Sequence, residues 1–325
     1  MIGRYGPPIF QILNGLAGAY NVALIKAIPS AIILKKFGWF VLKQETLFDF
    51  VEKLSQRSSG QTGVDLGQLK NYPIPLPPLP EQTAIASALS DMDALIAQTE
   101  KLIEKKKAIK QGVMQELLNP KEGWVTRKLG DVGKCLRGVS YNPELDLHPF
   151  SNEFNYTLLR SNNIFEGLLD FNNLQFVDKT RVKNHQVIKE MDIVICMANG
   201  SKQLVGKSAL AENVEMGKFT FGAFMGCFRS FENVNPKFIF SLMESKKYRD
   251  YIDVLLSGSS INNLNPVNIE SIEFEFPPLE TQDEITRIID SLRIELSLLT
   301  SKLQKLKLQK QGIMQALLTG KIRLA

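Results

Sequence analysis

Pro75-Leu76-Pro77-Pro78-Leu79-Pro80-Glu81-Gln82 begins the stretch of sequence that decides the fold, because the chain contains a second copy of it. Residues 77–118 and 277–318 align without a gap at an offset of 200, and 14 of the 42 aligned positions are identical. The identities gather at the two ends, where Pro77-Pro78-Leu79 recurs as Pro277-Pro278-Leu279 and Lys110–Gln115 recurs as Lys310–Gln315. An internal repeat of this kind indicates two copies of one structural unit.

Each copy is predicted to form one long helix that begins directly after a proline-rich segment. Proline ends the preceding element and favours an extended backbone before a helix starts. Aliphatic residues then recur at alternating intervals of three and four, the pattern of a coiled-coil seam. Neither helix can bury its seam alone, so we expect the two to pair antiparallel, with roughly 38 residues spanning about 57 Å. The seam positions are Ile85, Leu89, Met92, Ile96 and Ile103 in the first copy and Ile289, Leu292, Leu296, Leu299, Leu303 and Leu306 in the second.

The first seam is weaker in its middle, where Lys105-Lys106-Lys107 falls. Two interpretations stay open for these lysines. Their aliphatic stems can lie along a partner helix while the ammonium groups stay in water, or they can form an ordinary solvated helical face.

The region between the two helices is predicted to be a strand-rich mixed domain. Apolar runs at Tyr156–Leu159, Leu174–Val177, Asp192–Cys196 and Gly226–Phe231 are separated by Gly, Asn and Ser turns, which is typical of strands. Helical spacing predicts one helix over Pro236–Tyr251. The expected fold class is α+β, with strand-rich domains joined by two long antiparallel coiled-coil helices. The expected segments are residues 1–75, 76–119, 120–275 and 276–325.

Residues 1–75 look like the back half of the domain whose complete version follows the first helix. Gly18-Ala19-Tyr20 mirrors Gly222-Ala223-Phe224, and Phe40-x-Leu42 mirrors Phe240-x-Leu242. A counterpart of roughly residues 124–195 is not found in 1–75. Three explanations stay open: an inactive remnant, a recombined or misassigned start, or a chain that a second copy completes.

Composition excludes several classes of protein. The net charge of +5 is compatible with a polyanionic partner but does not by itself require one. Three separated cysteines and two histidines argue against a structural zinc site and suit a reducing cytoplasm. Pro7, Pro8 and Asn14 interrupt the apolar N-terminal stretch, which argues against a signal peptide. No uncharged apolar run reaches 18 residues, so no membrane span is expected.

No motif in the chain predicts catalysis. Gly200–Ser208 resembles a phosphate-binding loop, but five residues rather than four separate Gly200 from Gly206-Lys207-Ser208. The four Asn-Pro pairs lack the second proline and the aromatic of amino-methyltransferases. Glu244-Ser245-Lys246 lacks the preceding Pro-Asp of a nuclease metal site. No cofactor and no metal site are therefore expected on this chain.

The whole layout resembles the specificity subunits of type I restriction-modification systems. The residues that carry the resemblance are 75–82 with their helix, Trp124–Asp131 at the start of a domain, and Gly320–Leu324 at the end. Residues 158–167 and 192–207 also look like the target-recognition domain of that family. The resemblance implies two recognition domains that each read half of a bipartite double-stranded DNA target. It also implies that the paired helices act as a spacer and dock modification and restriction subunits, and that S-adenosylmethionine, ATP and magnesium are used by those partners.

Two polar loops of the complete domain are the candidate DNA-reading residues. Arginine suits guanine, asparagine and glutamine suit adenine, and lysine suits phosphate. Turn formation by the asparagines and ordinary surface charge for the lysines are the alternatives, and Ser259, Ser260 and Asn262 are more typical of a turn. The candidates are Arg160, Ser161, Asn162, Asn163, Asn199, Gly200, Ser201, Lys202, Gln203 and Lys207.

Three hypotheses follow: a DNA-specificity subunit without its own catalytic site, a truncated coiled-coil assembly adaptor that reads no DNA, and a nucleotide-dependent enzyme built on Gly200–Ser208. The first is the function we expect. Self-association to complete the first domain is a further expectation.

Overall fold

The computed structural model describes residues 1–3, 10–15, 18–55, 63–212, 214–215, 217–258 and 262–324. Two expectations depended on residues outside these ranges. The argument against a signal peptide used Pro7 and Pro8, and the predicted turn used Ser259 and Ser260. The chain divides into two compact units, and each is described by itself. Unit 1 comprises residues 1–105 and 296–325, and unit 2 comprises residues 106–295. The four predicted segments divide the chain differently, because both long helices contribute to both units, and those boundaries stay a prediction.

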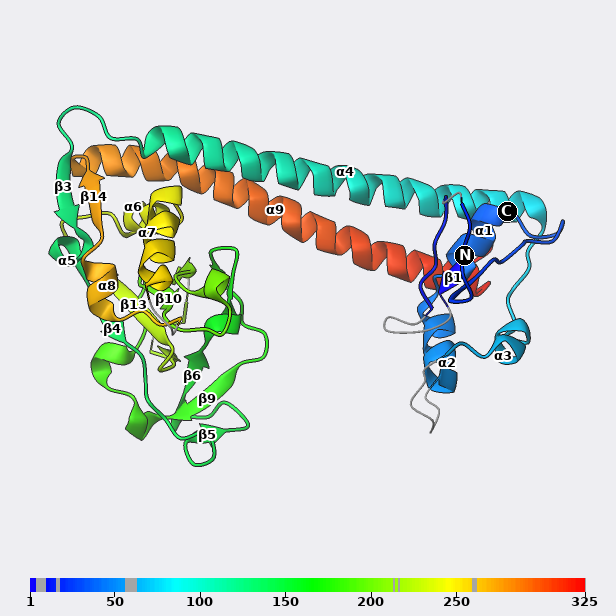
Figure 1. Cartoon of the computed structure of the whole chain (residues 1–325), viewed down its shortest axis with the longest axis horizontal. Helices are drawn as coiled ribbons and strands as arrows, with labels where there is room; N and C mark the ends of the chain where they lie inside the picture. Colours follow the sequence, from blue (N-terminus) through cyan, green and yellow to red (C-terminus); the bar gives the residue numbers. More distant parts are fainter. Residues whose placement is uncertain are drawn as a thin grey trace. The chain divides into compact units, whose positions relative to one another are not determined.

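The two repeats form the two longest helices, α4 (Leu79–Leu117) and α9 (Leu279–Leu318) (Figure 1). Their ion pairs show the direction of pairing in unit 1, where Asp93 contacts Lys310 at 2.6 Å and Glu100 contacts Lys307 at 2.8 Å. Residue numbers rise along one helix as they fall along the other, so the helices are antiparallel. The predicted α+β class with long antiparallel coiled-coil helices is confirmed.

The predicted seam positions lie on the inner faces of the two helices. The first seam has few aliphatic contacts around its lysines, and two of these lysines form ion pairs. Lys106 contacts Glu295 at 2.7 Å, and Lys107 contacts Glu166 at 2.7 Å. Their charges are therefore compensated where aliphatic contact is reduced. Five of the predicted seam residues are buried, namely Ile85, Leu89, Ile103, Ile289 and Leu306, and six are half-buried, namely Met92, Ile96, Leu292, Leu296, Leu299 and Leu303.

Unit 2 contains most of the strands of the described chain. One four-stranded sheet has the order β11-β10-β13-β4, and another has the order β12-β6-β9-β5, in which only β12 and β6 are parallel. Strand β14 pairs with β3, and β7 with β8. The strand bounds are β3 Val125–Lys128, β4 Gly133–Arg137, β5 Leu147–His148, β6 Asn155–Leu159, β7 Ile164–Phe165, β8 Leu168–Leu169, β9 Gln175–Asp178, β10 Ile193–Cys196, β11 Ser208–Leu210, β12 Phe219–Phe221, β13 Met225–Ser230 and β14 Glu273–Phe276.

Strand β10 lies inside unit 2 with both faces covered. Ile193 and Ile195 pack into one hydrophobic core, and Val194 and Cys196 into another. Alternate side chains of a strand point to opposite faces, so a continuous apolar run is what a strand between two cores requires. The short helices of unit 2 are α5 Leu129–Val132, η1 Ser161–Asn163, η2 Lys179–Arg181, η3 Asn184–Gln186, η4 Lys202–Leu204, α6 Pro236–Met243, α7 Lys246–Ser257 and α8 Pro266–Glu270.

The single helix predicted over 236–251 is wrong, because the structure has two helices there. Helix α6 ends at Met243, and helix α7 begins at Lys246. The Ser245 side chain accepts a hydrogen bond from the backbone N–H of Tyr248 and so caps α7. A serine that caps a new helix competes with continuation of the old one.

Unit 1 repeats part of unit 2. Strands β1 (Ile2–Gly3) and β2 (Leu24–Ile25) pair antiparallel, as β10 and β13 do. They are followed by α1 (Lys35–Val41), α2 (Glu45–Ser55) and α3 (Leu66–Lys70), which correspond in order to α6, α7 and α8. The order of elements is the same in both units, and the assignment of residues 1–75 as the back half of a recognition domain stays a prediction.

The register of this upstream repeat differs from the one predicted. At an offset of 201, the buried residues Leu47 and Val51 of α2 correspond to the buried Tyr248 and Ile252 of α7. At the predicted offset of 200, these pairs do not align. Phe37 therefore corresponds to Phe238, and Phe40 does not correspond to Phe240. The offset returns to 200 at α3 and α8, because unit 1 has one more residue than unit 2 between the starts of these helices and those of α2 and α7.

A buried glutamine at the start of each long helix holds the helix before it in place. Gln82 Oε1 accepts a 2.8 Å hydrogen bond from Leu34 N, and its Nε2 donates to Ile32 O and Pro77 O. Gln282 makes matching bonds: its Oε1 accepts from Asn235 N at 3.0 Å, and its Nε2 donates to Pro277 O at 2.9 Å. Both glutamine side chains are buried, so these hydrogen bonds are shielded from water on the glutamine side.

Replacing Gln82 or Gln282 by leucine is therefore expected to lower the free energy of unfolding of its own unit by about 2 kcal/mol. The physical reason is that buried backbone donors and acceptors lose their partners. Urea unfolding, with hydrogen exchange to identify the affected unit, measures the effect. The exposed Gln98 provides the control, and an equal loss in Gln98→Leu would contradict the assignment.

Candidate nucleic-acid interface

The two predicted polar loops of unit 2 meet in the structure. Residues 160–163 leave the end of β6, and residues 199–203 leave the end of β10. Asn199 Nδ2 donates a 3.2 Å hydrogen bond to Ser161 Oγ, which joins the loops directly. Lys207 Nζ donates at 2.6 Å to the carbonyl of Ile164, just beyond the first loop. We call residues 160–163, 199–203, 207 and 262 the polar face.

A third segment, after α7, supports the second loop. Leu264 N donates to Met197 O at 2.8 Å, and Asn262 Nδ2 donates to Gly200 O at 3.2 Å. Lys202 Nζ reaches Ser257 Oγ at 3.2 Å. The loop is thus held both through its backbone at Gly200 and through the Lys202 side chain.

The candidate residues differ in how far they are available to a ligand. Asn162, Gly200, Ser201 and Gln203 are exposed. Ser161, Arg160, Asn199, Lys202 and Lys207 are half-buried. The Asn199 Oδ1 atom accepts a hydrogen bond from Ser201 N at 2.9 Å, which is a turn contact. Asn199 therefore shapes the loop, as the alternative interpretation proposed, and also joins it to Ser161.

Asn163 is a correction to the predicted set. Its side chain is fully buried. Its Nδ2 donates to Asp170 O at 2.9 Å and to Asn172 O at 3.0 Å, and its Oδ1 accepts from Arg160 N at 3.0 Å. All of these bonds are internal, so Asn163 stabilises the loop and has no surface to present to DNA.

The positive side chains of the polar face bond to neighbouring groups. Arg160 Nη2 donates to Asn173 O at 2.8 Å, while its buried Nε has no hydrogen-bond partner among the described residues. On the neighbouring helix, Arg249 donates to Asp253 at 2.6 Å, and this bond lowers the pKa of Asp253, with the charge of Lys202 adding to the effect. Arg249 and Asp253 are thus a charged pair that also feels the charge of Lys202.

Sequence reasoning missed one aromatic residue beside this face. Phe224 is 72% exposed, and its carbonyl accepts hydrogen bonds from Met197 N and Ala198 N at 2.9 and 3.1 Å. Those bonds place the Phe224 turn against the start of the 199–203 loop. The repeat of Gly18-Ala19-Tyr20 in Gly222-Ala223-Phe224 was the available signal, since Tyr20 is exposed as well.

The loop that resembled a phosphate-binding motif has another geometry. Lys207 precedes strand β11, and Ser208 is a buried strand residue rather than the first residue of a helix. A phosphate loop needs a helix N-terminus at that point. The nucleotide hypothesis therefore fails on the local backbone.

Other chemistry finds no candidate site in the part of the chain that the structure describes. No group of three or more metal-ligating side chains is found there. The thiols of Cys135, Cys196 and Cys227 are buried, and burial raises the pKa of Cys135 to about 12, which disfavours the nucleophilic thiolate. None of the described helices combines the length and apolar character that crossing a membrane requires.

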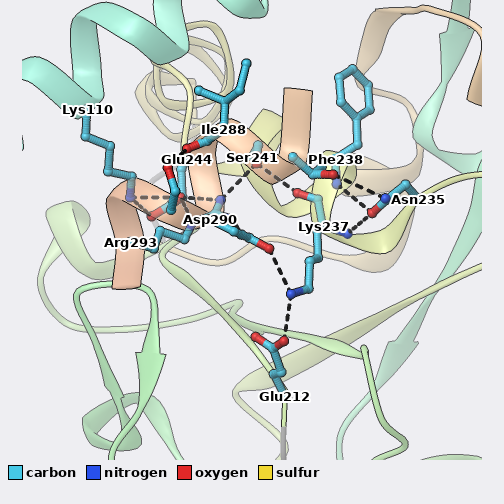
Figure 2. Close-up of polar contacts among 12 residues, drawn as sticks. Lys110, Glu212, Asn235, Lys237, Phe238, Ser241, Glu244, Ile288, Asp290 and Arg293 are labelled. Atoms are coloured by element: carbon cyan, nitrogen blue, oxygen red, sulfur yellow. Dashed lines mark hydrogen bonds and ion pairs between the residues drawn. The ribbon is translucent and has the colours of Figure 1, made fainter. Parts of the chain in front are cut away.

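A second polar cluster attaches the mixed domain of unit 2 to its helix segments (Figure 2). Glu244 accepts hydrogen bonds from Lys110 at 2.9 Å and from Arg293 at 2.8 Å. Lys237 contacts Glu212 at 2.6 Å and Asp290 at 2.8 Å. The cluster links α6 to both α4 and α9, and its charges are satisfied internally. It is therefore a structural junction rather than a binding site.

Comparison with known proteins identifies the family. The model of the type I restriction modification DNA specificity domain matches residues 13–110 and 121–308. The chain is 34% identical over 208 residues to the Type I restriction enzyme StySPI specificity subunit of Salmonella potsdam, covering 63% of this chain and 44% of that protein. It is 34% identical over 201 residues to the EcoKI specificity subunit of Escherichia coli K12, covering 62% and 43%. The chain thus spans less than half the length of these two curated relatives.

Solved structures show the same fold. The S subunit of a type I restriction-modification system from M. genitalium aligns with a TM-score of 0.56 at 16% identity, over 89% of this chain and 74% of that one. A chain from a structure of type I R-M complex assembly and conformational transition aligns with a TM-score of 0.51 at 14% identity, over 88% and 71%. The family model covers far more than half of the sequence, and the chain therefore belongs to the type I restriction modification DNA specificity domain family.

Proposed function

We propose that this chain reads DNA sequence for a type I restriction-modification complex, and that the polar face of unit 2 makes the contacts. The observation that carries the proposal is the meeting of the two loops through the Asn199–Ser161 hydrogen bond. It gathers exposed amides and nearby cations from separate strands onto one surface. Amides suit base edges in the major groove, and lysines suit phosphates.

Within this proposal, each exposed side chain has a distinct role. Asn162 and Gln203 present exposed amides and are assigned to bases, with adenine as the preferred partner. Lys202 and Lys207 neutralise phosphates. Phe224, an exposed ring on a fixed turn, contacts a thymine methyl group or an exposed base step. Arg160 supports the first loop and extends its positive edge.

The partners are part of the same proposal. Modification and restriction subunits would supply the chemistry, with S-adenosylmethionine, ATP and magnesium bound to them and not to this chain. The exposed residues Leu95 and Leu102, spaced by seven on the part of α4 that belongs to unit 1, give those subunits an apolar surface for helix docking. Self-association is also proposed, and light scattering of the purified chain tests it.

The experiment uses the chain assembled with its cognate modification subunit. Methylation mapping in cells with and without the chain first defines the target sequence. Binding to target and random duplexes is then measured at two salt concentrations, because phosphate contacts dominate the salt dependence and base contacts the sequence preference.

Asn162→Ala and Gln203→Ala are each expected to weaken target binding about 10- to 100-fold, as loss of about 1–3 kcal/mol of base contact implies. Their binding to random DNA should stay unchanged. Lys202→Ala should weaken both kinds of binding and reduce the salt slope. Asn233→Ala, three residues beyond the end of β13 that lies away from the polar face, is the matched control and should have no effect.

Two results would contradict the proposal. If no methylated motif depends on the chain, it does not direct modification. If the chain retains the modification subunit but binds target and random DNA equally, it acts as an assembly adaptor instead.

A further inference from the structure

The end of strand β4 lies close to the polar face of unit 2. Strand β13 pairs antiparallel with both β10 and β4, so β10 and β4 run in the same direction and finish at the same end of the sheet. The last residue of β10, Cys196, lies opposite Met225. The last residue of β4, Arg137, lies opposite Gly226, the next residue of β13. Two strand spacings, about 10 Å, therefore separate Arg137 from the strand that leads to residues 199–203.

The Phe224 turn lies between these two strand ends. On one side, the Phe224 carbonyl accepts hydrogen bonds from Met197 N and Ala198 N, which follow β10. On the other side, Gly138 N, which follows β4, donates a 3.2 Å hydrogen bond to Met225 O. The exposed Phe224 ring is thus carried by a turn that is bonded to the residues after β10 and to the residues after β4.

Gly138 fixes the separation of Arg137 from this turn. A Cβ at Gly138 would overlap the carbonyl oxygens of Gly222 and Phe221, so only glycine lets the two backbones approach this closely. The carbonyl of Arg137 also accepts a 3.0 Å hydrogen bond from Nε2 of the buried Gln186. The backbone at residue 137 is therefore held on two sides, which is what a side chain that has to meet a base accurately requires.

The guanidinium of Arg137 is available to a ligand. Its side chain is exposed, and within the described ranges no hydrogen bond or ion pair of that side chain is found. Other arginines of the mixed domain already bond to neighbouring groups, namely Arg160, Arg181, Arg229 and Arg249. Arg137 can thus use its N–H donors on a ligand without breaking a contact inside unit 2.

We infer that Arg137 reads a guanine of the DNA target, beside the base step that Phe224 contacts. A guanidinium donates two hydrogen bonds at once to O6 and N7 of guanine on the major-groove edge, which is the commonest base-specific contact. The separation of about 10 Å from the strand leading to residues 199–203 is smaller than the width of the major groove, about 12 Å, so both can enter one groove. The inference rests on the proposed function, because it assigns one more base to the same DNA-reading surface.

Replacement of one atom of a guanine in the target DNA tests this contact. The full chain, assembled with its cognate modification subunit, is titrated with target duplexes in which one guanine at a time is replaced by 7-deazaguanine. This base keeps its pairing but has a C–H group in place of N7, so it offers arginine one acceptor instead of two. At one guanine position, the replacement is expected to weaken binding of the original chain about tenfold.

Arg137→Ala shows whether the arginine causes that loss. The variant should bind the unmodified target about 10- to 100-fold more weakly, and 7-deazaguanine at the same position should then cause no further loss. Its binding to random duplexes should stay unchanged. Arg127→Ala is the matched control, because Arg127 is exposed in β3, which precedes the opposite end of β4. That variant should respond to every 7-deazaguanine position as the original chain does.

Two outcomes would overturn the role of Arg137. Equal loss of target and random binding in Arg137→Ala, with a reduced salt slope, would show a phosphate contact instead. Equal effects of 7-deazaguanine on Arg137→Ala and on the original chain, at every position, would show that the arginine does not meet N7. In both cases, a selective loss in Asn162→Ala would leave the proposed function intact. If the chain binds target and random DNA equally, the proposed function fails, and the role of Arg137 fails with it.

Discussion

Replacing Asp192 by alanine is expected to lower the free energy of unfolding of unit 2 by about 3–5 kcal/mol. Asp192 is buried, and it accepts hydrogen bonds from Arg229 Nε at 2.8 Å and Arg229 Nη2 at 2.6 Å. It also accepts one from Lys189 N at 2.8 Å. Loss of the carboxylate leaves the Arg229 guanidinium, only about a quarter exposed, without its counter-charge.

The Asp192–Arg229 pair lies at one end of a strand whose other end leads to the proposed DNA-contacting loop, so loss of the pair is expected to affect DNA binding as well as the stability of unit 2. Asp192 precedes β10, and the other end of that strand carries residues 199–203. Urea unfolding of the full chain measures the loss, and DNA binding at a temperature where the variant is folded measures its functional effect. Asp250→Ala removes an exposed pair with Lys246 and should change stability by less than about 1 kcal/mol.

A double substitution tests the cause. If the unpaired arginine causes the loss, Asp192→Ala combined with Arg229→Met should recover much of it, because no uncompensated charge then remains. A double variant as unstable as the sum of its two single variants would contradict this explanation.

Glu244→Ala is the second large effect, with an expected loss of about 3 kcal/mol from unit 2. Glu244 holds two cations, Lys110 of α4 and Arg293 of α9, and all three side chains are less than one fifth exposed (Figure 2). Arg293 also lies 4.6 Å from the centre of the Phe240 ring and bonds Ser241 Oγ at 2.8 Å. Without Glu244, the Lys110 ammonium loses its carboxylate while it is still largely buried, whereas Arg293 keeps Asp290 at 2.6 Å, so the cost falls mainly on Lys110.

Glu212→Ala is the matched control, since it removes a carboxylate from the same cluster at a more exposed place. Lys237 keeps Asp290 in that variant, so a loss of less than about 1 kcal/mol is expected. Thermal unfolding and hydrogen exchange of α6 compare the two. Equal losses would show that exposure does not govern the strength of these pairs.

The long helices could be predicted from the sequence because their cause is local and periodic. A seven-residue apolar repeat after a proline-rich segment permits few other structures. Strands β6, β9, β10 and β13 could be placed for a similar reason, since short apolar runs between turns have to be buried. The break between α6 and α7 escaped prediction, because the apolar spacing continues across Ser245 while its hydroxyl caps a new helix.

The candidate site was predictable in composition but not in geometry. Exposed polar loops indicated which residue types were available, yet an asparagine at a loop surface and a buried one look alike in sequence. Asn163 is buried because the carbonyls of Asp170 and Asn172, several residues further along the chain, turn back to accept its amide hydrogens. Phe224 escaped notice because an aromatic residue beside a strand is more often part of a core.

The sequence by itself determined the repeat, the two antiparallel helices, the α+β class and the family. Each of these can be recognised from residue types that recur at fixed intervals along the chain. Only the tertiary structure decided that residues 160–163 and 199–203 share one face, and that Arg137 ends a strand beside the Phe224 turn. Both follow from contacts between segments distant along the chain. Such contacts depend on the packing of the whole unit, and no local pattern encodes them.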